Sequence, residues 1–190
     1  TGGGNVAIGR QAGAAATSAD YNVLIGYKAG YDLTSGDDNV GVGREALENI
    51  TTGLTNVAVG RTAGYSLTTG TQNTFIGTHA AYAQTIGNYN TTLGYATLYT
   101  NVHGDFNVAI GHQALYATAG ADGQGRNVAI GADAGMANTT GIGNVFIGHA
   151  AGNNSGHDTE SNKLVIANST TTTPLIGGDF STPSVTINGT

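Results

Sequence analysis

The sequence predicts an all-β fold: a parallel β-solenoid, or β-roll, of about nine 17-residue coils, trimeric and closed by a C-terminal β cap. Three observations lead to it: a five-residue motif at a fixed spacing, β-branched residues that alternate within it, and an apolar residue between them. The motif first occurs as Asn5-Val6-Ala7-Ile8-Gly9. Its leading asparagines are Asn5, Asn22, Asn39, Asn56, Asn73, Asn90, Asn107, Asn127 and Asn144. Neighbouring asparagines lie 17 residues apart, except for Asn107 and Asn127, which lie 20 apart. So constant a spacing indicates units that stack, since one such unit cannot bury a core alone.

Each motif predicts a short strand followed by a turn. The first and third residues after the asparagine are Val, Ile, Leu or Thr in every coil, from Val6 and Ile8 to Val145 and Ile147. Alternating β-branched residues are typical of a strand, and the glycine that follows each time is suited to a turn. We expect the two alternating residues to point into the core of the coil.

The residue between them is the strongest indication of a partner. In a strand this side chain faces the opposite way, and a solvated position would be polar, yet eight of the nine residues are apolar or Gly. A strand buried on both faces carries continuous apolar sequence. We therefore predict a homotrimer about the long axis. Its predicted interface consists of Ala7, Leu24, Ala58, Phe75, Ala109, Ala129 and Phe146.

The second half of each unit predicts a tight turn with helical character. Ala46, Leu47 and Ile50 have the spacing of one apolar helical face, so short helical turns are one option. A second, outer strand is the alternative, because Gly30 and Gly64 occupy this part of their coils and weaken a helix.

The asparagine column predicts a structural ladder. Amides at one phase of stacked coils can bond from each coil to the next, as stacked amides do. The alternative is that Asn serves only its corner conformation. We favour the ladder.

The period divides the chain into three predicted segments. Residues 1–152 form the repeat solenoid, 153–161 a polar linker, and 162–190 a C-terminal β cap or neck that covers the last core layer. Two strands are expected in the cap at 162–168 and 174–180, with 185–187 as a candidate third. Extra residues within 117–126 predict a loop. The chain begins in mid-pattern, which favours a fragment or a processed piece of something longer.

Composition argues against several classes of function. A net charge of −6 disfavours a nucleic-acid partner and an anionic membrane surface. The chain has no cysteine, so neither a disulfide framework nor thiolate chemistry is expected. We find no apolar run long enough to cross a bilayer and no signal peptide, so we expect no membrane insertion.

We also expect no enzyme activity, no metal and no cofactor. The main acidic residues are Asp32, Asp37, Asp38, Glu45 and Glu48. They lie at different phases without a metal-ligand run, so we interpret them as a solvated surface. His112 and His149 share a phase but lie two coils, or about 9–10 Å, apart, too far to share one metal ion. A polysaccharide depolymerase would need a carboxylate pair in a groove, and the sequence suggests none.

Tyrosine is the residue type that suggests a binding surface. The candidate binding residues are Tyr27, Tyr31, Tyr65, Tyr82, Tyr95, Tyr99 and Tyr116. These rings either stack between coils or form an outward row that stacks on sugar faces. Thr-Thr pairs such as Thr51-Thr52 resemble the hydroxyl rows of ice-binding solenoids, a remote alternative because those rows need Thr-x-Thr within one strand.

Asn-Val-Ala-Ile-Gly with its downstream turn resembles the head repeats of trimeric autotransporter adhesins, which form a left-handed parallel β-roll in a trimer. The longer unit at 56–70 is more similar to the repeat regions of phage-type tail fibres. Residues 162–168 and 173–181 resemble the segment that precedes a self-cleaving intramolecular chaperone domain in such fibres.

The resemblance implies a structural and receptor-binding fibre protein. Such a protein would be extracellular or on the surface of a virion or injection system, and its partner would be a cell-surface glycan or protein receptor. A bacterial cell-surface adhesin or an extracellular filament subunit is the alternative.

Overall fold

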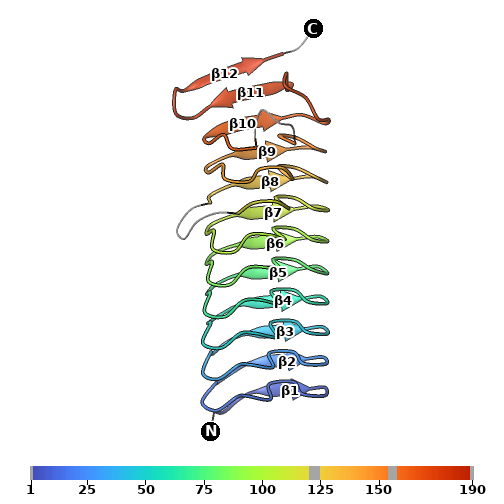
Figure 1. The fold of residues 1–190 in the computed structure, drawn as a ribbon, viewed down its shortest axis with the longest axis vertical. Helices are drawn as coiled ribbons and strands as arrows, with labels where there is room; N and C mark the ends of the chain where they lie inside the picture. Colours follow the sequence, from blue (N-terminus) through green and yellow to red (C-terminus); the bar gives the residue numbers. More distant parts are fainter. Residues whose placement is uncertain (1, 120–124, 154–157, 189–190) are drawn as a thin grey trace.

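Twelve short strands stack along one axis in the computed structural model, which describes residues 2–119, 125–153 and 158–188 (Figure 1). Each motif contributes one three-residue strand: β1 (Val6–Ile8), β2 (Val23–Ile25), β3 (Val40–Val42), β4 (Val57–Val59), β5 (Thr74–Ile76), β6 (Thr91–Leu93), β7 (Val108–Ile110), β8 (Val128–Ile130) and β9 (Val145–Ile147). Three four-residue strands follow: β10 (Lys163–Ile166), β11 (Ile176–Asp179) and β12 (Ser184–Ile187). The fold is an all-β solenoid of about nine coils, as predicted.

All twelve strands belong to one sheet in chain order. Pairing is parallel from β1 to β10 and antiparallel from β10 to β12. The register follows the repeat, since Val23 pairs with Val40 and Val40 with Val57. The other layer of the coil is also bonded along the stack: the Gly30 N–H donates to the Ala46 carbonyl at 2.9 Å.

That second layer is a series of turns. Glu45 and Leu47 have φ angles of 59° and 51°, whereas a right-handed helix needs negative φ at every residue. The described residues contain no helix. The helical spacing of Ala46, Leu47 and Ile50 arises because all three side chains turn into the core, where each is 0% exposed.

The middle residue of each strand points into the coil, which reverses the predicted orientation. At most 2% of each side chain is exposed in Leu24, Ala58, Phe75, Ala109, Ala129 and Phe146. Ala7 lies on the same inward side of β1, facing Gly13, and is exposed because no described coil lies beyond it. The prediction that these seven residues form an oligomer interface is therefore wrong, since six of them fill the core and the seventh faces the same way.

The asparagine ladder is present and explains this orientation. Asn56 is fully buried, and its Oδ1 accepts the backbone N–H and the Nδ2–H of Asn73, both at 3.0 Å. Its Nδ2 donates to Asn39 Oδ1 at 3.0 Å and to the Gly70 carbonyl at 2.8 Å. Asn22, Asn39, Asn73, Asn90, Asn107 and Asn127 each donate in the same way to the preceding motif asparagine. Because the asparagine points inward, so must the residue two positions later.

The motif glycine sets how closely the coils approach. Gly60 has a φ of 137°, which L side chains rarely adopt, and a Cβ added to it would lie 2.6 Å from the Gly77 carbonyl oxygen. The same carbonyl contact recurs at Gly26, Gly43 and Gly77. Any side chain here would push neighbouring coils apart.

Beyond β9 the regular stack gives way to the cap. The predicted loop at 117–126 and linker at 153–161 lie partly outside the described residues. The described end of that linker continues the ninth coil, since the Asp158 backbone carbonyl accepts the Thr139 N–H at 2.6 Å and the Glu160 carbonyl accepts Asn144 Nδ2–H at 2.8 Å. The strands predicted at 162–168, 174–180 and 185–187 are present as β10, β11 and β12.

We expect Asn56→Ala to destabilise the chain by about 3–5 kcal/mol, because the N–H and Nδ2–H of Asn73 and the Gly70 carbonyl would lose buried partners. The control is Thr52→Ala, which shortens an exposed turn residue. Urea unfolding followed by circular dichroism measures both. An equal loss in the free energy of unfolding in both variants would show that the ladder contributes no more stability than an exposed turn residue.

Candidate functional site

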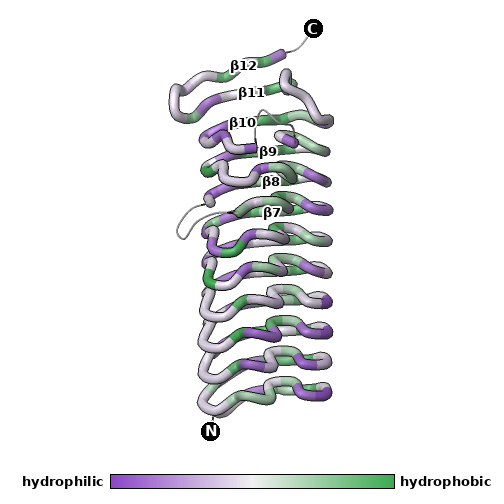
Figure 2. The backbone as a smooth tube through the Cα atoms, in the orientation of Figure 1, coloured by the Kyte–Doolittle hydropathy of each residue, from purple (hydrophilic) through white to green (hydrophobic). Residues whose placement is uncertain are grey.

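The two outward residues of every strand form a continuous surface, which we call the apolar face. The strand pairing aligns them as two columns: Val6, Val23, Val40, Val57, Thr74, Thr91, Val108, Val128, Val145, Leu164, Gly178 and Val185, and Ile8, Ile25, Val42, Val59, Ile76, Leu93, Ile110, Ile130, Ile147, Ile166, Ile176 and Ile187. Only Thr74, Thr91 and Gly178 among these positions are not aliphatic. Figure 2 shows hydrophobic colouring recurring along the strands through the stack.

These side chains meet solvent. Ile8 is 57% exposed, Leu93 48% and Ile187 71%, while most of the others are partly buried. Eleven spacings of about 4.8 Å make the face about 53 Å long, and a width of about 10 Å gives roughly 500 Å². A patch of this size equals the largest apolar patch of a typical monomeric protein, and such patches are often functional. Sequence reasoning placed these residues in the core; the structure makes them the candidate site.

A rim lines each side of the apolar face. The leading rim consists of the residues just before each motif asparagine: Gly4, Tyr21, Asp38, Thr55, Gln72, Tyr89, Phe106, Arg126 and Gly143. The trailing rim consists of the residues just after each motif glycine: Arg10, Tyr27, Arg44, Arg61, Thr78, Tyr95, His112, Ala132 and His149. Both lie two residues from an outward position, and most of their side chains are exposed. The face is therefore rimmed by polar, charged and aromatic groups, as binding patches are.

The candidate tyrosines stack along the chain. The ring centroids of Tyr65, Tyr82, Tyr99 and Tyr116 follow one another at 5.0–5.2 Å with nearly parallel planes. Tyr95 stacks on His112 at 5.4 Å.

Basic side chains cover the two N-terminal rings. Arg10 and Arg44 both lie over the ring of Tyr27, and Lys28 lies 5.0 Å from the centre of the Tyr31 ring. Because neighbours occupy the faces of Tyr27, Tyr82 and Tyr99, these three rings offer a ligand mainly ring edges and hydroxyl groups.

The first threonine of the pairs at 51–52, 68–69 and 139–140 bonds within the stack. Thr51 Oγ1 donates to the Thr68 carbonyl at 3.1 Å, and Thr68 Oγ1 donates to the Thr85 carbonyl at 3.0 Å. These hydroxyls tie coil to coil, and this speaks against the flat hydroxyl array that an ice-binding surface requires.

Glu48 and Asp37, both interpreted as solvated surface, have contacts that join one coil to another. Glu48 is only 7% exposed and pairs with Lys28 Nζ at 2.8 Å. Asp37 Oδ1 accepts the backbone N–H of Asp20 at 2.7 Å, and Asp105 does the same for Asn88. This second ladder beside the leading rim was not anticipated from the sequence. No group of three or more His, Cys, Asp or Glu side chains in the described part of the chain could hold a metal ion.

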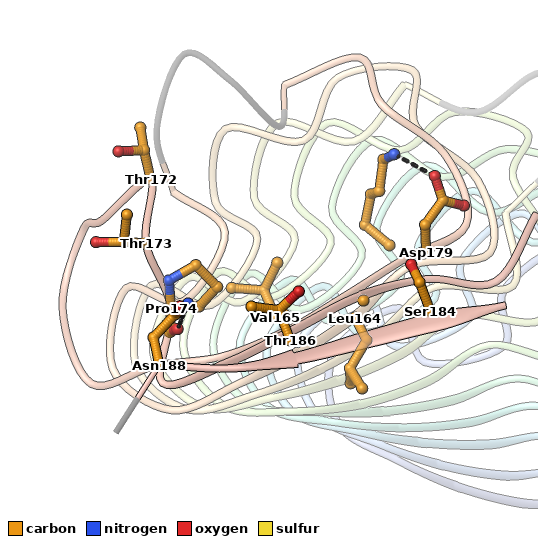
Figure 3. Close-up of a pocket in the computed structure, with 12 residues that line it drawn as sticks. Leu164, Val165, Thr172, Thr173, Pro174, Asp179, Ser184, Thr186 and Asn188 are labelled. Carbon is orange, nitrogen blue, oxygen red and sulfur yellow. Dashed lines mark hydrogen bonds and ion pairs between the residues drawn. The ribbon is translucent and has the colours of Figure 1, made fainter. Parts of the chain in front are cut away.

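The cap contains a hollow of about 300 Å³ on its inward side, which Figure 3 shows in close-up. It lies where the core column passes from Phe146 and Val165 to Gly177 and Thr186, so the apolar filling of the coil ends there. Lys163 Nζ contacts Asp179 at 2.8 Å beside it. This ammonium, with hydrogen bonds from Ser181, holds the pKa of the Asp179 carboxyl well below its ordinary value.

A second hollow of about 300 Å³ opens on the outward side, where Gly178 interrupts the apolar column between Leu164 and Val185. Asp179, Phe180, Pro183 and Ser184 complete its lining. The apolar face thus continues onto the cap and contains a notch there.

Comparisons with known proteins found no matching family model, curated protein or solved structure. Among the described residues, no helix has the length and apolarity needed to cross a membrane.

His79 lies among aromatic rings beside the trailing rim. Its ring meets Tyr82, Tyr95 and Tyr99 edge-on. Its Nδ1 lies 2.7 Å from Thr62 Oγ1. Burial, reinforced by the positive charge of nearby Arg61, lowers the pKa of His79.

We expect acid to destabilise the fold through His79. Its pKa is lowered in the folded chain, so the unfolded chain binds the proton more readily, and stability falls as pH drops below about 6.5. His79→Gln should reduce the loss of melting temperature between about pH 7.5 and pH 5.5, whereas His149→Gln, at an exposed rim position, should not. An unchanged pH dependence in His79→Gln would contradict this account.

Proposed function

We propose that this chain is one protomer of a trimeric fibre protein that attaches to a cell surface. The observation that carries the proposal is the apolar face. This face exposes roughly 500 Å² of aliphatic surface along a rigid sheet, continuous from β1 to β12, and contact of that surface with water is unfavourable. A second and third copy of the chain are the partners that match its length coil for coil.

The shape of the face favours rotation about the stack axis. Each strand presents only two outward residues, so the face is a narrow stripe parallel to that axis. Three such stripes can enclose an axis and exclude water along it, and cyclic symmetry keeps equivalent coils at one height. The buried stripes would then serve as a second core, added to the one inside each coil.

The outer surface of such a fibre is available for attachment. Rows of tyrosine edges and hydroxyls recur at the coil spacing, as at Tyr82 and Tyr99, and three copies would multiply a weak contact into useful avidity. The resemblance of the motif to adhesin and tail-fibre repeats supports an extracellular or virion-surface location and a glycan or protein receptor.

Val59→Asp should abolish assembly, because it places a carboxylate in the middle of the apolar face. Light scattering at micromolar concentration should give the native chain three times the mass of its 19.0-kDa protomer. Val59→Asp should give a single protomer, while Thr52→Asp, on an exposed turn, should stay trimeric. A native monomer would contradict the proposal.

The same two variants test attachment. Native protein and Thr52→Asp should bind glycan arrays or intact cells with an apparent affinity about 100-fold above that of monomeric Val59→Asp. A native trimer that binds no surface would leave the protein a purely structural fibre. Release of reducing ends from the glycans would instead indicate a depolymerase.

A further inference from the structure

The two rims of the apolar face carry matching residues at four levels, β2, β3, β6 and β7. At β3, Asp38 on the leading rim lies opposite Arg44 on the trailing rim. At β2 and β6 the rims carry a tyrosine on each side, and at β7 they carry Phe106 and His112. At β1 and β4 the leading rim carries Gly4 and Thr55 while the trailing rim carries arginine. The remaining levels pair Gln72 with Thr78, Arg126 with Ala132 and Gly143 with His149, so no level sets two charges of the same sign against each other.

Matched rim residues cannot meet within one chain. Asp38 and Arg44 lie on opposite sides of β3, six residues or about 20 Å apart along nearly extended backbone. Arg44 instead bonds its neighbour Glu45 at 2.9 Å. Any contact between the leading and trailing rims at one level must therefore join two copies.

The aromatic levels show the same need for a partner. Tyr21 is 67% exposed, Tyr89 47% and Phe106 45%, unusually open for large rings. Tyr89 stacks on Phe106 at 4.8 Å within the leading rim, and Tyr95 stacks on His112 within the trailing rim. Each rim thus presents a preformed row of ring edges at the levels of β6 and β7.

We propose that the copies stand parallel and in register, with the leading rim of each chain against the trailing rim of the next. This rests on the proposed assembly and adds its direction and register. Asp38 then meets Arg44 of the neighbouring copy, and the aromatic rows meet at β2, β6 and β7. An antiparallel pair would set the trailing rim against itself, and that rim contains arginines and histidines but no acid.

A charge swap tests the pairing. Asp38→Arg should raise the protein concentration for half-assembly about tenfold, because the arginine would face Arg44 of the neighbour at each junction. The leading rim already carries Arg126, and the trailing rim carries Ala132 and Thr78, so both positions accept other side chains. Arg44→Asp should weaken assembly similarly, and the double variant D38R/R44D should return to within about twofold of the native value.

Arg61→Asp is the matched control for register. It makes the same charge change on the same rim one coil higher, where the leading rim carries Thr55. D38R/R61D should stay as weak as D38R alone; rescue by R61D in place of R44D would overturn the register. If D38R fails to fold, Asp38→Asn at low and high salt replaces it.

The outcomes separate the two proposals. A native monomer would remove the assembly itself. A native trimer in which neither double variant is rescued would overturn only the pairing of the rims.

Discussion

The buried asparagine ladder is the interaction on which the other features of this structure depend. Each motif amide from Asn22 to Asn90 satisfies both donors and both acceptors, as Asn56 does with Asn39, Asn73 and Gly70. An amide in that position must point into the coil, because a buried polar group without partners is costly. The ladder therefore fixes the spacing of the repeat and the direction of every strand side chain that follows it.

The direction of the strand side chains explains the unusual distribution of apolar residues. The size of the inward middle residue of each strand depends on the space that the opposite layer leaves. The two largest residues, Phe75 and Phe146, lie next to Gly64 and Gly135. The outward positions are aliphatic in nearly every coil. Each coil thus has a buried core inside and an exposed apolar surface outside. In the proposed fibre, copies of the same chain bury that outer surface.

Much of this fold could be predicted from the sequence, because a fixed period exposes the strands, the ladder and the cap directly. The orientation of the strands could not be read from hydrophobicity alone, since Val57, Ala58 and Val59 are all apolar. The ladder determines the orientation: because Asn56 points inward, Ala58 must also point inward. Glu45 and Leu47 adopt left-handed conformations where a helical turn was expected. The spacing of the apolar residues does not distinguish these two conformations. The match between the rims emerged only once residues before and after each strand could be placed on one face.

The most direct test of the account is the solvent access of the outward positions. The chain has no cysteine, so single cysteines at Val57, Val59 and exposed Thr52 each provide one thiol for maleimide labelling. If the apolar face is buried between copies, the thiols at 57 and 59 should react at least about 100-fold more slowly than the thiol at 52, and should react fully once the assembly dissociates. Equal rates at all three positions in the native protein would show that the apolar face is open to water and that the chain stands alone.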